Sequence, residues 1–600
     1  MADKAIRTVV ALGASLALSM WATVGLGTPS TAQAAPGAAV FLDSKIHGNP
    51  GHNHAIDHDQ GRVSATAERV LEKPLPKPKG YVDEFGPAVT NLPTVQVPVE
   101  GRAELAAMAV PSAGTWVNGP RIERVVHVFD LPRTMTSDTY MASAGSGNYP
   151  AYGTGGAQQR YFGSIYDRTT KTLTPFNLSF DMFCATAVHD ENGDIILAGG
   201  TGAYPANNKE VSGTWGGLDD SYRYDVSSNQ FIRLGNMNYK RWYPEFFKDQ
   251  ASNIHVHGGQ HNGVQIAPWE KLARGATTWQ VISGLSLAMN SYAAMELIAP
   301  NVFAYTGVKS SLTSLSKPPF IIDMGTKRRT TTPGLRDANV RRSAAALPLF
   351  PAQDEKVLVV GGGAASGTTG TTLVDLIDYS VWPASVPRFV PRASLQLPTV
   401  FPNMVNLPNG QPFLAGGSRA WRTGDILQAA IYDPESDNWT WVAPHRYGRD
   451  YHSAMHVNLN GSVSLFGGNP GLNNFQSQVE EYRPWYMDGR PRPALGLASL
   501  RAFIPAGDTL PALSKGGSVT IDVTVPSGSS IGRFTLDGAR ASTHVSSDAG
   551  QMMFDLPFTQ AGGRYTVTIP NHYKLTLGAY KLTAVTADDV PSVSVWAKVV

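Results

Sequence analysis

A strand-like apolar run that ends in glycine recurs seven times, and this repeat constrains the fold of the chain more than any other feature. The first glycines of the seven runs are separated by 49 to 59 residues, and they are Gly145, Gly199, Gly258, Gly307, Gly361, Gly416 and Gly467. A unit of this size that ends its strands in glycine cannot bury both of its faces alone, so neighbouring units must stack. We therefore expect seven similar sheets arranged around an axis.

The repeat resembles the kelch repeat, a four-stranded propeller blade of about 50 residues. Several runs are followed by Tyr-Asp and then an aromatic residue, as between Ile431 and Trp439. After Trp485 the repeat stops, and stretches such as Ser518 to Val525 alternate apolar and polar residues, as strands of an antiparallel sandwich do. The predicted fold is all-β: a seven-bladed kelch propeller over residues 112–486 and an immunoglobulin-like sandwich over residues 487–600.

The first 111 residues predict an export signal followed by a linker. Lys4 and Arg7 precede an apolar stretch, and small residues around Ala34 and Ala35 form a cleavage site, so residues 1–35 are expected to direct export. The apolar stretch is also long enough to act as an uncleaved membrane anchor. Residues 36–111 contain a proline-rich linker and the histidines from His47 to His58, for which a solvated linker is favoured over a metal site.

Charge and cysteine content narrow the class of function. A net charge of +2 in 600 residues gives no reason to expect nucleic acid as a partner. Cys184 is the only cysteine, whereas exported proteins normally pair their cysteines. A lone thiol in an oxidising compartment is buried, forms a disulfide with another chain or takes part in a chemical reaction of the protein.

Four short segments place redox-active or metal-binding side chains near the repeat glycines or in the C-terminal region. They are Asp181 to Cys184, Lys240 to Pro244 with Tyr243, Arg449 to Ser453 with Tyr451 and His452, and Ala541 to His544. Taken singly, each residue has an ordinary structural interpretation, such as an amphipathic strand tyrosine or a solvated histidine. Their joint occurrence in this order indicates a shared site.

These segments resemble those of the copper radical oxidases, the galactose oxidase and glyoxal oxidase family, over residues 112–600. The resemblance implies one copper ion and a thioether cofactor formed by Cys184 and Tyr243. It also implies that Tyr243, His452 and His544 are equatorial copper ligands and that Tyr451 is the axial ligand. The implied enzyme is secreted and oxidises a primary alcohol or aldehyde, either on a glycan or in a small molecule, with O2 to give H2O2.

The chemistry of these residue types agrees with that assignment. Two imidazoles with phenolate oxygens suit tetragonal Cu(II) better than tetrahedral zinc. A sulfur substituent makes a phenol easier to oxidise, and a single cysteine suffices for it. We expect Tyr451 to act as general base. Because Tyr451 and His452 are adjacent, their strand must end or bulge there for both to reach one metal.

Departures from the family pattern leave the substrate open. Where galactose oxidase has a tryptophan over the thioether, this sequence has His261, so Trp215 or Trp269 is the alternative cover for the ring. The segment from Arg241 to Pro244 is closer to the glyoxal oxidase pattern. Two other functions stay open: a non-catalytic propeller that binds glycans or proteins, and a copper-binding wall or developmental protein with incidental oxidase activity.

Overall fold

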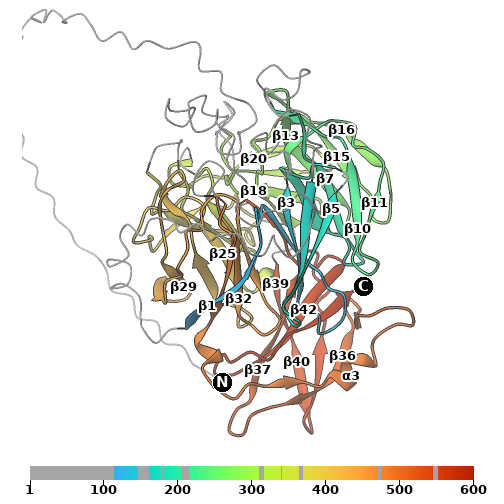
Figure 1. The fold of residues 1–600 in the computed structure, drawn as a ribbon, viewed down its shortest axis with the longest axis vertical. Coiled ribbons are helices and arrows are strands. Elements are labelled where there is room, and N and C mark those ends of the chain that lie inside the picture. The colour runs from blue at the N-terminus through green and yellow to red at the C-terminus, as the bar shows by residue number, and fades with distance from the viewer. Residues whose placement is uncertain are drawn as a thin grey trace, which may run out of the picture. The chain divides into compact units, whose positions relative to one another are not determined.

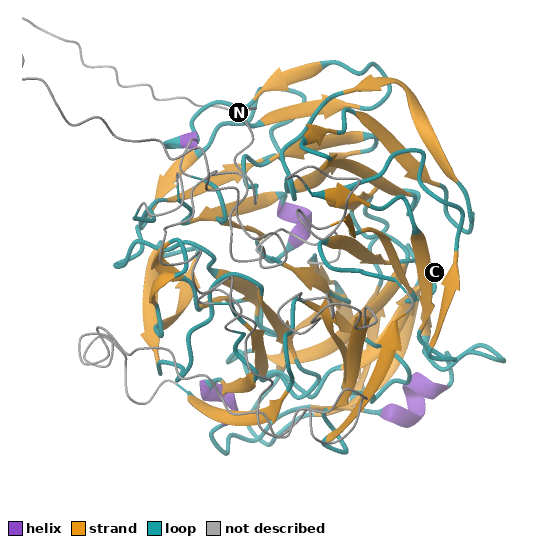
Figure 2. Cartoon of the chain, turned by 45° about the horizontal axis from the view of Figure 1, so that its top comes forward, coloured by secondary structure: helices purple, strands orange, loops and turns teal. Residues whose placement is uncertain are grey.

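The computed structural model describes a β-protein, and the described residues are 114–145, 161–178, 180–203, 215–309, 317–338, 341–363, 369–469, 475–544 and 552–600. The predicted export signal, linker and histidine cluster lie outside them. Within the described ranges, no helix is long and apolar enough to cross a membrane. Strands dominate the chain and the helices are short (Figure 2).

The described residues from Thr115 to Arg483 form seven antiparallel sheets, each built on four strands. In the first four, each strand pairs with the next along the sheet, and the strands are β2 (His127–Asp130), β3 (Thr139–Gly145), β4 (Tyr161–Asp167) and β5 (Thr172–Leu178); β6 (Ala185–His189), β7 (Ile195–Gly199), β10 (Ser221–Asp225) and β11 (Gln230–Arg233); β12 (Trp242–Lys248), β13 (Ile254–His261), β15 (Pro268–Leu272) and β16 (Trp279–Ser286); and β17 (Met295–Ala299), β18 (Val302–Tyr305), β19 (Phe320–Asp323) and β20 (Arg329–Thr331).

The other three sheets follow the same order, except that the last takes its outer strand from the start of the described chain. They are β21 (Ala345–Pro348), β22 (Lys356–Val360), β23 (Val374–Asp378) and β24 (Val390–Arg392); β25 (Asn403–Asn406), β26 (Pro412–Ala415), β29 (Ala429–Asp433) and β30 (Asn438–Val442); and β31 (Ser453–Val457), β32 (Val463–Gly467), β33 (Gln478–Arg483) and β1 (Thr115–Arg121). Because β1 pairs with β33, the two ends of this region are joined within one sheet.

Short additional elements lie between these strands and after them. They are the strands β8 (Thr201–Ala203), β9 (Gly216–Gly217), β14 (Val264–Gln265), β27 (Ser418–Ala420) and β28 (Thr423–Asp425), the 3-10 helices η4 (Ala352–Asp354) and η5 (Trp485–Met487), and the α-helix α3 (Leu497–Arg501).

The fold is a β-propeller followed by a β-domain, as the sequence predicts. The first strands of neighbouring sheets pack against one another: β6 on β12, β12 on β17, β21 on β25, β25 on β31 and β31 on β2. Five of the seven repeat glycines lie at the end of a second strand or directly after it, while Gly258 lies within β13 and Gly307 lies two residues after β18. At Gly467, where φ is +64°, a Cβ atom would lie 2.7 Å from the His452 carbonyl oxygen, so only glycine permits this approach.

The C-terminal region is a two-sheet sandwich (orange to red in Figure 1) around one apolar core. One sheet contains β34 (Ala494–Leu495), β36 (Ser518–Thr524), β41 (Arg564–Thr568) and β40 (Phe558–Ala561), and the other contains β35 (Ala512–Leu513), β43 (Val595–Val599), β42 (Gly578–Thr586), β37 (Ile531–Gly538) and β39 (Met553–Leu556). The strand β38 (Ala541–Thr543) leaves the sandwich and pairs with β2 of the propeller.

A buried polar cluster around Asp130 fixes this junction. The Asp130 carboxylate accepts hydrogen bonds from His456 Nδ1 (2.8 Å), Lys581 Nζ (2.9 Å) and the Arg540 backbone N–H (3.0 Å). Two of these partners come from the C-terminal sandwich and one from β31. Because the lysine and the carboxylate are both buried, removal of either partner would leave an unpaired charge inside the protein. The cluster therefore holds β38 inside the propeller.

Candidate metal and radical site

The five side chains that the sequence analysis singles out come from four elements and are all buried. Cys184 directly precedes β6, Tyr243 is the second residue of β12, Tyr451 and His452 directly precede β31, and His544 directly follows β38. The exposed fraction of each side chain is 6% or less. The propeller thus contributes four side chains and the C-terminal domain one.

Left-handed backbone conformations aim four of these side chains. The φ angles are +64° at Cys184, +61° at Tyr243, +64° at His452 and +54° at His544. Such angles are uncommon for residues with a Cβ and are found where the surrounding structure enforces them, often at functional sites. For three of the four the fold itself is the cause, because Arg124, Tyr292, Ser343 and Phe401 adopt positive φ at the corresponding place in the other four sheets.

Two phenol oxygens and an imidazole nitrogen converge at the centre of the site. The Tyr243 and Tyr451 hydroxyl groups are hydrogen-bonded to each other, and His544 Nε2 lies 3.1 Å from each hydroxyl oxygen. The His452 ring lies beside them, 3.8 Å from the Tyr451 ring and 4.5 Å from the His544 ring, centroid to centroid. The four predicted ligand side chains therefore share one location.

Cys184 lies next to Tyr243. Both belong to one buried apolar cluster, and the thiol is within hydrogen-bonding reach of the Tyr243 side chain. Burial raises the pKa of the Cys184 thiol well above its usual value. The thiol thus stays protonated at neutral pH unless an oxidising metal acts on it.

Trp242, a residue that the sequence analysis did not consider, covers the Tyr243 ring. The two rings are parallel within 7° and their centroids are 3.7 Å apart. Trp215 stacks on Trp242 with ring centroids 4.9 Å apart, and it belongs to the same buried cluster as Tyr243. Trp269 packs against His257 in a different cluster, and His261 Nδ1 accepts the Gly217 N–H. Of the three candidates from the sequence, Trp215 alone joins this stack.

Tyr292 is a second missed contributor. Its ring centroid lies 4.7 Å from that of Tyr243 and 4.6 Å from that of His544, and its hydroxyl donates to the Ala185 carbonyl oxygen at 2.9 Å. The repeat would have identified it, because Tyr292 occupies the place in its sheet that Tyr243 occupies in the preceding one.

Buried arginines anchor the turns that present the site residues. Arg241 Nη1 donates to the Gly258 carbonyl oxygen at 2.8 Å and pairs with Glu270 at 3.0 Å. Arg449 does the same with Gly467 O at 2.7 Å and Glu480 at 3.0 Å. Each arginine precedes a site residue by two or three positions, so each ion pair fixes a turn as well as a sheet.

The electrostatic environment disfavours charge on the site residues themselves. Burial raises the pKa of Tyr243 and Tyr451, while Arg422 and Arg342 oppose the shift at Tyr451. Burial, with His127 and Arg422, lowers the pKa of His544. The metal-free site therefore contains neutral phenols and a neutral His544 imidazole, and neutral imidazole is the form that binds metals.

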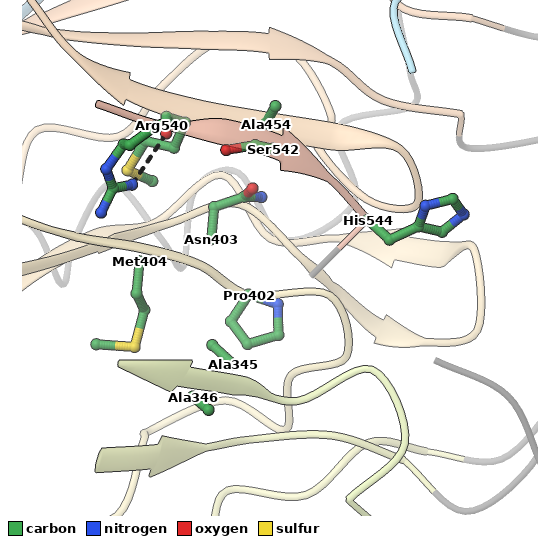
Figure 3. Close-up of a pocket in the computed structure, with 10 residues that line it drawn as sticks. Ala345, Ala346, Pro402, Asn403, Met404, Ala454, Arg540, Ser542 and His544 are labelled. Carbon is green, nitrogen blue, oxygen red and sulfur yellow. Dashed lines mark hydrogen bonds between the residues drawn. The ribbon is translucent and has the colours of Figure 1, made fainter. Parts of the chain in front are cut away.

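A small cavity lies along β38 behind His544. Its volume is about 30 Å³, and its polar lining includes Arg540, Asn403 and Ser542. Figure 3 shows the His544 ring at one end of this lining and Arg540 at the other. The Arg540 Nη1 atom donates to the Met455 carbonyl oxygen at 3.3 Å. The cavity is of water size and is separate from the Tyr451 face of the site.

The donor set fits copper. Among the described residues, no three His, Cys, Asp or Glu side chains are grouped to hold a metal ion. At this site the tyrosine oxygens add to the imidazole donors. Two imidazoles and two phenol oxygens in one buried place form a nitrogen and oxygen set of the kind that Cu(II) prefers.

Comparisons with known proteins support the copper radical oxidase resemblance. Residues 505–599 match the family model described as "Galactose oxidase-like, Early set domain". Two galactose oxidases of Gibberella zeae, one of them from strain PH-1, are each 25% identical to this chain over 459 residues, which cover 72% of it and 62% of the relative. The chain thus matches less than two thirds of their length.

A solved structure shares the fold. It is described as a novel fungal alcohol oxidase with catalytic diversity among the AA5 family, in complex with copper, and it matches with a TM-score of 0.65 and 21% identity over 81% of this chain and 99% of that one. With the family model and the curated relatives, it confirms the resemblance to the copper radical oxidases that the sequence indicates.

Proposed function

We propose that the chain is an exported copper radical oxidase. It would oxidise a primary alcohol or aldehyde by two electrons and reduce O2 to H2O2. One observation carries the proposal: His544 Nε2 of the C-terminal domain lies 3.1 Å from the hydroxyl oxygens of both Tyr243 and Tyr451 of the propeller. The neighbouring Cys184 thiol supplies the second half of the cofactor. For an alcohol the balance is RCH2OH + O2 → RCHO + H2O2.

Tyr243, Tyr451, His452 and His544 would hold the copper ion. When bound, the ion would supply Lewis acidity toward the substrate oxygen and accept one electron. The protein supplies the other one-electron site, the Tyr243 ring, and a thioether to Cys184 would lower the energy needed to oxidise that ring. No organic cofactor is then required.

The two tyrosines would divide the proton and hydrogen transfers between them. Tyr451 Oη would accept the proton of the substrate hydroxyl as general base. The oxidised Tyr243 Oη would accept a hydrogen atom from the substrate carbon. The hydrogen bond between the two hydroxyl groups supports this division, because one substrate carbinol group could reach both oxygens. Trp242 covers one face of the Tyr243 ring and keeps solvent from it.

The experiment is a peroxide-coupled screen on copper-loaded protein. Short primary alcohols, small aldehydes and glycans with primary hydroxyls are tested for equal consumption of O2 and release of H2O2. We expect at least one class to react, and Tyr243→Phe to abolish turnover. If no substrate reacts and copper binds without altering Cys184, a non-catalytic propeller is the better description.

A further inference from the structure

An arginine–aromatic cluster surrounds Tyr451, and its other four members have no part in the function proposed above. It consists of Arg342, Phe401, Trp421, Arg422 and Tyr451. The Arg422 guanidinium carbon lies 4.1 Å from the Tyr451 ring centroid, and the Arg342 guanidinium carbon lies 3.7 Å from the Trp421 ring centroid. Phe401 contacts both Trp421 (4.7 Å) and Tyr451 (5.4 Å).

The cluster is assembled from four turns that approach from neighbouring sheets, and the turn before β31 carries Tyr451. Trp421 and Arg422 form the turn between β27 and β28, with φ of +53° at Arg422. Arg342 and Phe401 lie in the turns that precede β21 and β25, and Phe401 also has positive φ. Trp421 and Arg422 are only partly buried, whereas Arg342 is fully buried, so Arg422 is the guanidinium nearer to solvent.

Positive charge is concentrated beside the predicted base. Both guanidinium groups act electrostatically on Tyr451, and Lys309 is paired along the backbone with Arg342. Two buried carboxyl groups, Asp425 and Asp450, also belong to this region, and Asp450 Oδ1 accepts the Asn469 backbone N–H at 2.8 Å. Burial raises the pKa of both carboxyl groups, and Arg422 opposes the shift at Asp450.

The aromatic part of the cluster is poorly suited to stacking a sugar. Arg342 covers one face of Trp421 and the Phe401 ring meets it at 60°. A guanidinium fork, in contrast, matches a carboxylate with two parallel hydrogen bonds. The Arg422 guanidinium carbon lies 4.1 Å from the centroid of the Tyr451 ring. A single small molecule at the Tyr451 hydroxyl can therefore also reach the guanidinium.

We propose that Arg422, supported by Arg342 and Trp421, binds a substrate carboxylate and selects short primary alcohols or aldehydes that carry a carboxylate beside the reacting carbon. This inference rests on the proposed function and names its substrate class. For hydroxyacetate the balance is HOCH2COO⁻ + O2 → OHCCOO⁻ + H2O2. One C–H bond and the O–H bond of the alcohol break, and two protons and two electrons pass to O2. The carboxylate is unchanged.

The experiment compares glycolate with ethylene glycol, which differ in the carboxylate. On copper-loaded protein we expect Arg422→Gln to raise KM for glycolate by about tenfold or more, since a charge-assisted pair is lost. The ratio of kcat/KM for glycolate to kcat/KM for ethylene glycol should fall by about tenfold or more, and Arg422→Lys should restore part of the glycolate preference. Arg490→Gln, which removes an exposed arginine stacked on Trp485 away from the site, is the control.

Binding of glycolate to the metal-free protein, followed by ligand-observed NMR, separates this inference from the proposed function. Binding that Arg422→Gln abolishes and Arg490→Gln preserves supports the carboxylate site even if neither alcohol is oxidised. If the wild-type protein oxidises ethylene glycol as well as glycolate and Arg422→Gln lowers both equally, Arg422 has only a structural role and the inference is wrong. The inference is also wrong if metal-free wild-type protein does not bind glycolate.

Discussion

The imidazole rings of His452 and His544 lie 4.5 Å apart at an interplanar angle of 80°, although one belongs to the propeller and the other to the C-terminal sandwich. This approach exists only because β38 pairs with β2 inside the propeller. Removal of the sandwich would take away a donor as well as a supporting domain. Folding of the two regions and assembly of the site are therefore one event.

Asp130→Asn tests this coupling. The change removes the buried charge that faces Lys581 and His456, so we expect a loss of about 3–5 kcal/mol in the free energy of unfolding. We also expect a lower affinity for copper, because displacement of β38 would move His544. Urea denaturation and metal analysis after dialysis measure the two effects. Asp522→Asn, which breaks the exposed pair with Arg564, is the control and should cost less than about 1 kcal/mol. Equal effects of the two changes would contradict the coupling.

The pH dependence of stability should reflect buried neutral histidines such as His257. Burial lowers the pKa of His257 from 6.5 to about 3. The unfolded chain binds this proton more readily than the folded one, so the contribution of His257 is fully present above pH 6.5 and is lost as the pH falls toward 3. The slope of unfolding free energy against pH gives the number of protons that the chain takes up on unfolding. In His257→Gln, this number should be smaller by about one in this pH window. An unchanged slope would show that His257 is not the group responsible.

Tyr451→Phe separates metal binding from proton transfer. The variant keeps Tyr243, His452 and His544, so we expect it to retain copper and the cross-link while kcat falls by about 10²–10⁴. Steady-state oxygen uptake compares kcat between the variant and the wild type, and metal analysis compares their copper content per chain. Turnover equal to that of the wild type would exclude Tyr451 as the base.

Trp242→Leu tests the protective role of the stacked ring. Without the indole that lies 3.7 Å from the Tyr243 ring, the oxidised phenol should decay faster, and its optical band should disappear sooner after chemical oxidation. Trp279→Leu removes a tryptophan that stacks on Phe246 in another cluster, and it should leave this decay unchanged. If the two variants decay alike, the stack has no protective effect.

The sequence predicted the β-propeller and the β-domain because their signals are local: a glycine after a second strand, and alternation in the sandwich strands. It could not predict the Trp242–Tyr243 stack, since adjacent strand residues ordinarily face opposite sides of a sheet. The φ of +61° at Tyr243 brings the two rings together, and the φ of +64° at His452 does the same for Tyr451 and His452.

The arginine–aromatic cluster was also beyond sequence reasoning. Its members come from four turns, and only the approach of neighbouring sheets brings Arg342 onto Trp421. Neither residue carries a motif of its own. By contrast, the five candidate site residues were recognised through a family resemblance, and their placement around His544 Nε2 depends on the insertion of β38.

The most direct test of the central claim is the intact mass of the chain after anaerobic copper loading followed by exposure to air. The account predicts that the wild-type chain loses the mass of two hydrogen atoms, that Cys184 becomes resistant to alkylation, and that Cys184→Ser and Tyr243→Phe show no mass loss. An unchanged wild-type mass with Cys184 still open to alkylation after unfolding would contradict the thioether between Cys184 and Tyr243, and with it the proposed radical site.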